Sequence, residues 1–106
     1  MKLLMRTTAI IVSILFVVVA NARAQDDVAS LYKAKCQACH GADGKAGTPA
    51  GKKLGARDFQ SPEVAKLSDA ELFDITKKGK DKMPAYDKKL TDDQIKGLIQ
   101  YIRSLK

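Results

Sequence analysis

Both cysteines and the single histidine of this chain fall within five consecutive residues, Cys36-Gln37-Ala38-Cys39-His40. Residues three positions apart on a helical turn face the same side, so Cys36 and Cys39 can both bond the vinyl groups of one porphyrin. The adjacent imidazole of His40 can then reach the iron. This spacing is the attachment signature of c-type haem, and it predicts a fold built around one covalent haem c.

Two other kinds of site use closely spaced cysteines. A redox dithiol of the thioredoxin type accompanies alternating strands and helices, and the sequence shows no such pattern. A structural zinc site needs four ligands, usually Cys or His, and this chain supplies only Cys36, Cys39 and His40. Both alternatives are therefore weaker than haem attachment.

A second axial ligand for the iron can be sought among the methionines, because methionine commonly pairs with histidine in cytochromes c. Met1 and Met5 lie in a segment that we expect to be removed, which leaves Met83. Pro84 pushes Met83 away from helical geometry, so this segment should run extended, as a strap across the far face of the haem. A lone methionine can also be a core filler, but we interpret Met83 as the ligand.

The first 24 residues have the pattern of a secretory signal peptide. Lys2 and Arg6 precede an apolar run over residues 9–19, and Ala22-Arg23-Ala24 is a small-residue cleavage site. The run is shorter than the roughly 20 residues that span a bilayer, so we expect no stable membrane insertion of the mature chain. We expect cleavage after Ala24, a mature cytochrome domain over residues 25–106, and a periplasmic location.

The mature chain predicts one small all-α domain, with three to four helices and loops wrapped around one haem. Its apolar core alone would be marginal, and burial of the haem would complete it, so we expect the chain without haem to be largely disordered. Residues 41–55 show no sustained period and are interpreted as a loop, in which Pro49 marks a carbonyl for the ring N–H of His40. The helix start signals are Asp26 or Asp27, Ser61-Pro62, Ser68-x-x-Glu71 and Thr91-x-x-Gln94.

Over residues 26–105 the chain resembles the small class I cytochromes c, near the bacterial and cytochrome c6-like branch. The attachment motif, the segment Lys82-Met83-Pro84-Ala85-Tyr86 and the apolar period of the last helix carry this resemblance. It implies that the first and last helices cross, with Tyr32, Leu98 and Tyr101 at the contact. The family usually has a small residue where this chain has Val28, and Gly97 could provide part of the missing room.

The expected function follows from the iron's ligands. With His40 and Met83 in both axial positions, no site remains open for bond chemistry, and the protein would shuttle single electrons between redox partners. The alternatives are an electron-accepting subunit of a dehydrogenase and, if Met83 is labile, a peroxidase. A haem-based gas sensor also needs a labile ligand, and no output domain is visible.

The distribution of charged side chains indicates how the protein would bind its partners. Without Lys2, Arg6 and Arg23, the 19 basic residues become 16 against 12 acidic ones, a formal charge of +4. Lysines cluster around Met83 and before Cys36, which fits steering toward partners that are acidic at the docking face; a merely solvated surface is equally consistent. No nucleic-acid motif is present, and we expect a monomer. The lysines are Lys33, Lys35, Lys77, Lys78, Lys80, Lys82, Lys88 and Lys89.

Four side chains from the part of the sequence that follows the attachment motif are candidates to surround the haem. Arg57 suits a haem propionate, although an exposed surface arginine is the simpler interpretation. Leu54, Phe59 and Phe73 are candidate pocket residues, but an ordinary apolar core would use them equally.

Overall fold

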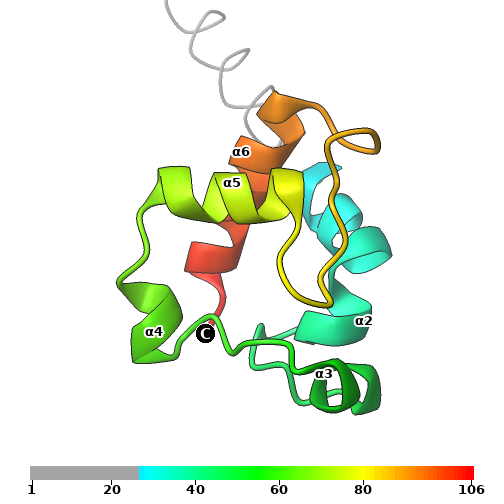
Figure 1. Ribbon diagram of the computed structural model, residues 1–106, viewed down its shortest axis with the longest axis vertical. Helices are drawn as coiled ribbons and strands as arrows, with labels where there is room; N and C mark the ends of the chain where they lie inside the picture. The colour runs from blue at the N-terminus through cyan, green and yellow to red at the C-terminus, as the bar shows by residue number, and fades with distance from the viewer. Residues whose placement is uncertain (1–26) are drawn as a thin grey trace, which may run out of the picture.

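Helices make up the regular structure of this computed structural model, which describes residues 27–106 (Figure 1). The predicted signal peptide, residues 1–24, lies outside the described residues. Within residues 27–106 the only β-type pairing is an isolated bridge between Lys80 and Met83, so the all-α prediction is confirmed. The helices are residues 27–35, α2 (Gln37–His40), α3 (Pro49–Leu54), α4 (Pro62–Ala65), α5 (Asp69–Lys78) and α6 (Asp92–Ser104).

Three helices begin where the sequence places their caps. Ser68 and Thr91 each accept a hydrogen bond from the backbone three residues on, and Glu71 and Gln94 bond back to complete two capping boxes. Ser61 caps α4 in the same way, with Pro62 at the first helical position. These local bonds satisfy N–H groups that would otherwise lack partners at the helix starts.

The prediction of a continuous loop over residues 41–55 was wrong, because α3 lies within it. Thr48 caps α3 by accepting a hydrogen bond from Gly51 N, and Pro49 occupies the first helical position. Gly55 ends the helix in the left-handed conformation, with φ 71°. The start and stop signals were present, but six residues are too few to show a helical period.

The main core forms where the helix of residues 27–35 packs against α6. The rings of Tyr32 and Tyr101 lie 5.1 Å apart, and Leu98 is buried beside them. Gly97 faces Val28 so closely that an added Cβ would lie 2.9 Å from Val28 Cγ2. Gly97 therefore provides the room that the resemblance implied.

Helices α5 and α6 are joined by polar contacts as well. The Arg103 guanidinium lies 2.7 Å from the Asp69 carboxylate and donates to the carbonyl of Leu67 at 2.6 Å. At the other end of α5, Lys77 pairs with Asp92 at 3.1 Å. Among the described residues, no helix is both long and apolar enough to cross a membrane.

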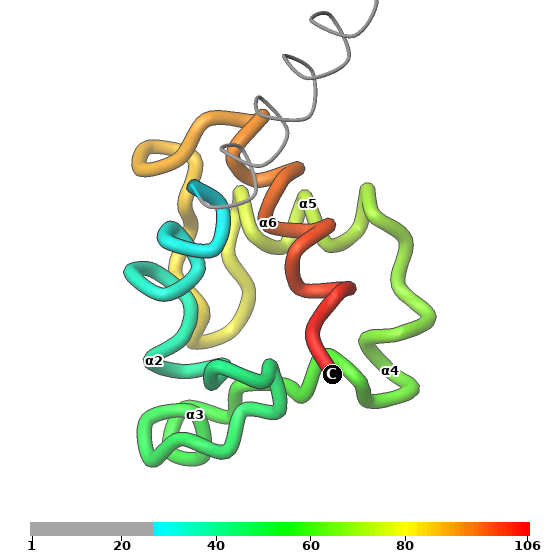
Figure 2. Tube along the Cα trace, turned by 180° about the vertical axis from the view of Figure 1, so that it is seen from behind, coloured from blue at the N-terminus to red at the C-terminus, as the bar shows by residue number. Residues whose placement is uncertain are grey.

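α3 packs directly against the back of α2, at the lower end of the molecule in Figure 2. The Thr48 hydroxyl donates to the carbonyls of Ala38, at 2.7 Å, and Cys39, at 3.2 Å. Gly51 touches the same strip of backbone: a Cβ built there would lie 2.1 Å from Cys39 O. Only a residue without a side chain allows the two helices to approach this closely.

Substitution Gly51→Ala should therefore destabilise the protein although alanine is the better helix former. We expect the free energy of unfolding to fall by about 2–3 kcal/mol, as for overpacking against backbone that cannot yield. The matched control is Gly47→Ala, because a Cβ at Gly47 meets nothing within 4 Å. The control should change the same quantity by less than about 1 kcal/mol. Denaturant unfolding followed by circular dichroism measures both, and equal effects would contradict the close contact.

Candidate functional site

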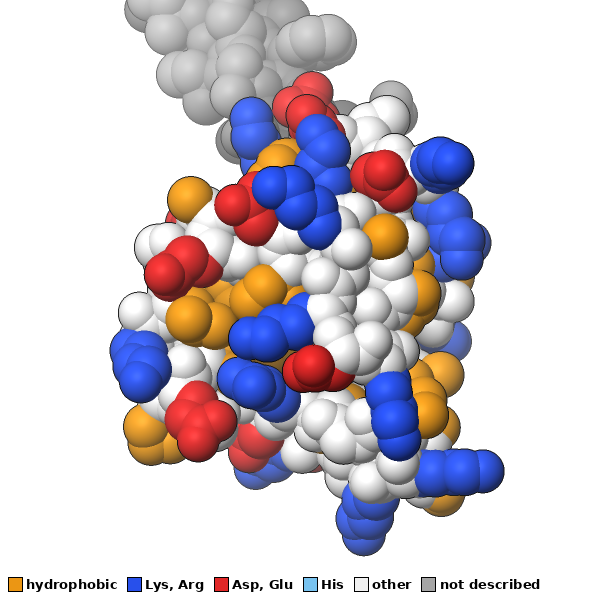
Figure 3. Space-filling view, viewed as in Figure 1, with side chains coloured by type: hydrophobic (Ala, Val, Ile, Leu, Met, Phe, Trp, Pro, Cys, Tyr) orange, Lys and Arg blue, Asp and Glu red, His pale blue; other side chains and the backbone are white. Residues whose placement is uncertain are grey.

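A cavity of about 200 Å³ lies between the attachment segment, α5, α6 and the segment around Met83. Its walls are largely apolar, although Lys35, Lys80, Asp81 and Lys82 also line it. Figure 3 shows this face, where apolar side chains are visible in a hollow with basic side chains beside it. The apolar walls come from separate parts of the chain: Leu54, Phe59, Val64, Leu67, Leu72, Ile75, Pro84, Leu98, Ile99 and Ile102.

The two cysteines reach this cavity from one helical turn. Cys36 continues the preceding helix, since its N–H bonds to Tyr32 O at 2.9 Å, and its carbonyl accepts from His40 N at 3.0 Å. Both thiols are free, half-buried and in the cavity wall. The structure thus brings Cys36, Cys39 and His40 together as the spacing predicts.

The environment of Cys36 bears on the alternative of a redox dithiol. Burial raises the pKa of the Cys36 thiol to about 11, so it stays protonated at neutral pH. A reactive dithiol needs a lowered pKa, because the thiolate is the attacking species. Nor does a zinc site gain support, because within residues 27–106 no group of three or more Cys, His, Asp or Glu side chains could hold a metal ion.

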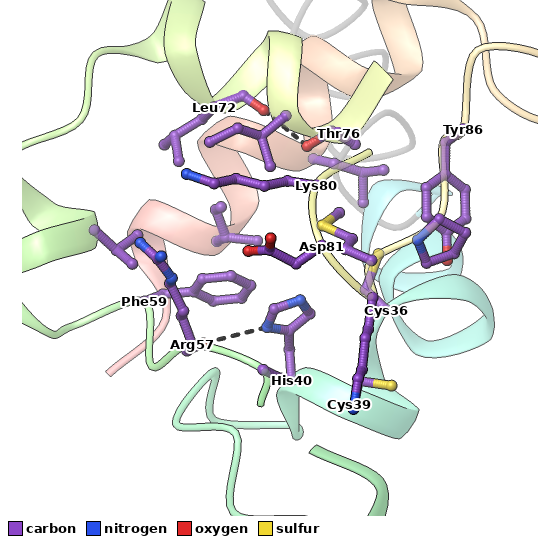
Figure 4. A pocket seen from close by; sticks show the side chains of 18 of the residues that line it. Cys36, Cys39, His40, Arg57, Phe59, Leu72, Thr76, Lys80, Asp81 and Tyr86 are labelled. Carbon is purple, nitrogen blue, oxygen red and sulfur yellow. Dashed lines mark hydrogen bonds between the residues drawn. The ribbon is translucent and has the colours of Figure 1, made fainter. Parts of the chain in front are cut away.

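The imidazole of His40 is held on two sides (Figure 4). Nδ1 lies 3.3 Å from the carbonyl oxygen of Arg57, and the ring stacks on Phe59 with the centroids 4.5 Å apart. A carbonyl can only accept, so Nδ1 carries the proton and Nε2 keeps its lone pair. Burial lowers the pKa of His40, and the hydrogen bond to Arg57 opposes this effect only in part. The lowered pKa favours the neutral form of the ring, which is the form that binds metal.

The partner of the His40 ring corrects one sequence expectation. We expected a carbonyl near Pro49, but the acceptor is the carbonyl of Arg57, beyond the end of α3. The physical reason is that Pro49 begins a helix, so the chain comes back beneath the imidazole only after Gly55 has ended that helix. No local sequence signal marks such a backbone acceptor.

Met83 enters the cavity wall from a strap, which we define as residues 80–86. Gly79 ends α5 with φ 77°, and Lys80 and Met83 then exchange two backbone hydrogen bonds of 3.1 and 2.9 Å. Between them the chain reverses at Asp81, whose φ is 53°. Met83 is half-buried and lines the same cavity as His40. Its ligation to iron stays a prediction.

Several other expectations concern the surroundings of the cavity. Leu54, Phe59 and Arg57 line it, but Phe73 does not: Phe73 packs against the core, with the Lys77 ammonium 5.6 Å from its ring centre. The Arg57 guanidinium lies 3.9 Å from the exposed Glu63 carboxylate. Thr76 and Tyr86 also line the cavity. Tyr86 belongs to the segment that carries the resemblance, but sequence reasoning gave neither residue a role in the cavity.

Of the lysines that we expected near Met83, Lys80 and Lys82 line the cavity, and so does Lys35 from the pair before the attachment motif. Lys77 is instead paired with Asp92, and Asp81 places an acidic side chain at the cavity. The border of the cavity is therefore basic overall, but Asp81 interrupts it.

The chain is similar to known c-type cytochromes. Residues 23–102 match the family described as cytochrome C oxidase, cbb3-type, subunit III. A comparison with curated proteins found no match. Among solved structures, the KustC0563 c-type cytochrome is 36% identical with a TM-score of 0.67, over 74% of this chain and 95% of that chain. A tyrosine-to-phenylalanine mutant of Kustc0563 is 35% identical with a TM-score of 0.68, over 76% of this chain and 99% of that one.

If the cavity is completed by a haem bonded to the two thiols, their removal should unfold the domain. We expect the double variant Cys36→Ala/Cys39→Ala to lose most of its helical circular dichroism, because a core with a cavity this large is poorly packed. The control is Ser30→Ala, at an exposed position of the same helix, which should keep both its helicity and its cooperative melt. A fully helical double variant with a cooperative melt would refute the dependence.

Proposed function

Since the chain belongs to the cytochrome c family described as cbb3-type oxidase subunit III, and its cofactor is covalent haem c, we propose that it shuttles single electrons between redox partners. The coarser role, an electron-transfer haem protein, is that of the family. We further propose that Cys36 and Cys39 form the two thioethers. His40 and Met83 are the proposed axial ligands.

The residues of the cavity fit this cofactor. The walls are largely apolar, as burial of a large planar macrocycle requires, and two free thiols with the Cys-x-x-Cys spacing of haem attachment lie in them. When bound, the haem iron supplies a one-electron redox centre. The protein's own residues provide attachment, ring orientation and exclusion of water.

The observation that carries the proposal is the placement of His40 and Met83 in one cavity. The Arg57 carbonyl holds the proton on Nδ1 of His40, which leaves Nε2 as a lone-pair donor of fixed direction. The thioether of Met83 is a second donor in the wall of the same cavity. Two protein ligands leave no position for oxygen or peroxide, which favours electron transfer over bond chemistry.

One alternative has specific support. The family description names an oxidase subunit, so the domain could instead work within a larger enzyme complex. Against this, the alignments cover 95% and 99% of two solved c-type cytochrome chains, so those chains are little more than this one domain. We favour a monomeric free carrier, exported to the periplasm by residues 1–24. Stable co-purification with a larger protein would favour the subunit instead.

Partners of this carrier are proposed to be acidic at the docking face. The border of the cavity carries Lys35, Lys80 and Lys82 against Asp81, a local excess of positive charge. Such a patch raises the rate of encounter with a negatively charged partner, and salt weakens the effect.

Optical spectra of the purified protein and of Met83 variants test the ligation. The oxidised wild type should be low-spin and show the weak charge-transfer band of methionine–iron ligation at the red end of the visible spectrum. Met83→Ala should lose the band and become high-spin. Met83→His should lose the band but stay low-spin, with a lower reduction potential, because methionine raises the potential relative to histidine. A wild type that is high-spin without the band would move the peroxidase and sensor alternatives ahead.

Ionic strength tests the steering. We expect oxidation by ferricyanide to slow several-fold as ionic strength rises from about 0.01 to 0.1 M, where the Debye length falls from about 30 to 10 Å. Lys80→Gln/Lys82→Gln should react more slowly at low salt and respond less to salt. Lys96→Gln/Lys106→Gln makes the same change in net charge away from the cavity, and it should behave as the wild type. An oxidation rate that does not change with ionic strength would contradict electrostatic steering.

A further inference from the structure

The side chain of Tyr86 bridges the two segments that carry the proposed haem-binding residues. Its hydroxyl donates a hydrogen bond of 3.0 Å to the carbonyl of Lys35, the residue before Cys36. Tyr86 itself ends the strap, three residues after Met83. Figure 4 shows its ring beside Cys36 at one side of the cavity. A single phenol thus spans from the strap to the attachment helix.

The backbone of Tyr86 is fixed as well. Its N–H bonds to Thr76 O at 3.1 Å, which ties it to α5, and its carbonyl accepts from Leu90 N at 2.9 Å. The ring is half-buried against the core, and the Lys89 ammonium lies 5.5 Å from its centre. Tyr86 is therefore an anchor whose position the rest of the fold determines.

Between this anchor and Met83 the strap makes no backbone hydrogen bonds of its own. Pro84 and Ala85 are exposed, and neither takes part in the loop and turn backbone hydrogen bonds of residues 27–106. Three extended residues reach at most about 10 Å, so the position of Tyr86 limits where Met83 can lie. The Lys80–Met83 pair closes the strap on itself, and the strap backbone passes close to Gly79, where an added Cβ would lie 2.7 Å from Met83 O.

Another tyrosine makes the contrast clear. Tyr32 donates to the carbonyl of Gly41 at 2.6 Å, just after His40, but Tyr32 belongs to the attachment helix itself. The two hydroxyls thus bond to carbonyls on either side of the attachment motif. Only that of Tyr86 connects the motif to the strap.

We propose that Tyr86 is a positioning residue whose hydroxyl holds the strap at the separation from the attachment helix at which the Met83 thioether reaches the iron. This inference rests on the proposed function, in which Met83 is the second axial ligand. Loss of the hydroxyl lets the strap move outward while the aromatic ring still packs. The sixth position of the iron then opens more often to an added ligand.

Imidazole added to the oxidised holoprotein measures this opening, because it competes with Met83 for the sixth position. Tyr86→Phe should bind imidazole about five-fold more tightly than the wild type, the ratio that corresponds to one hydrogen bond of roughly 1 kcal/mol. The matched control is Tyr101→Phe, which removes a phenol hydroxyl at the crossing with Tyr32 and should leave the affinity within about two-fold. The affinity of Met83→Ala for imidazole gives the upper limit, because this variant has no thioether to compete.

The outcomes separate the two proposals. If Met83→Ala binds imidazole no more tightly than the wild type, Met83 is not a ligand, and both the ligation and the role of Tyr86 are overturned. If Met83→Ala binds more tightly but Tyr86→Phe matches the wild type, the carrier stands and the role of Tyr86 fails. Denaturant unfolding of Tyr86→Phe completes the test: lower stability with unchanged imidazole affinity assigns the hydroxyl to folding alone, which also overturns the proposal.

Discussion

The protein by itself buries few apolar side chains. The fold therefore depends on the cofactor to complete its core. Eight hydrophobic residues of the described chain are buried, and four of them, Val64, Leu72, Leu98 and Ile99, also line the cavity. Their inner faces have few neighbours until the cavity is filled, and dispersion contacts are lost on any side without partner atoms. Covalent haem c is therefore part of the core as much as it is the redox centre. The helices and the strap are its walls.

Backbone carbonyls, more than pairs of side chains, orient the side chains around the cavity. Arg57 contributes its carbonyl to His40, and Gly41 and Lys35 contribute theirs to the hydroxyls of Tyr32 and Tyr86. A carbonyl belongs to the chain path itself, so it is present whatever side chain occupies the position. The site is thus sensitive to the paths of the loops, and the close approach of Gly51 to Cys39 is one place where such a path is fixed.

Local signals predicted the parts of this structure that local physics determines. The attachment spacing placed Cys36 and Cys39 on one wall, and the capping residues Ser68 and Thr91 marked the starts of α5 and α6. α3 escaped notice because so short a helix has no readable period, although Thr48 and Gly55 bounded it. The acceptors of His40 and Tyr86 could not be predicted, since each bond joins segments that only the complete fold brings together.

The contact between Tyr32 and Tyr101 has a consequence for the order in which the protein is assembled. The helix that leads to Cys36 has its main packing partner in α6, at the opposite end of the chain. Closing so long a loop is entropically costly, and it cannot happen at all until the last helix has been made and has emerged. Until α6 is available, the two thiols belong to a segment that lacks its main packing partner. The order of the elements in the sequence therefore makes the crossing of these two helices a late event in folding, well after the attachment motif has been made.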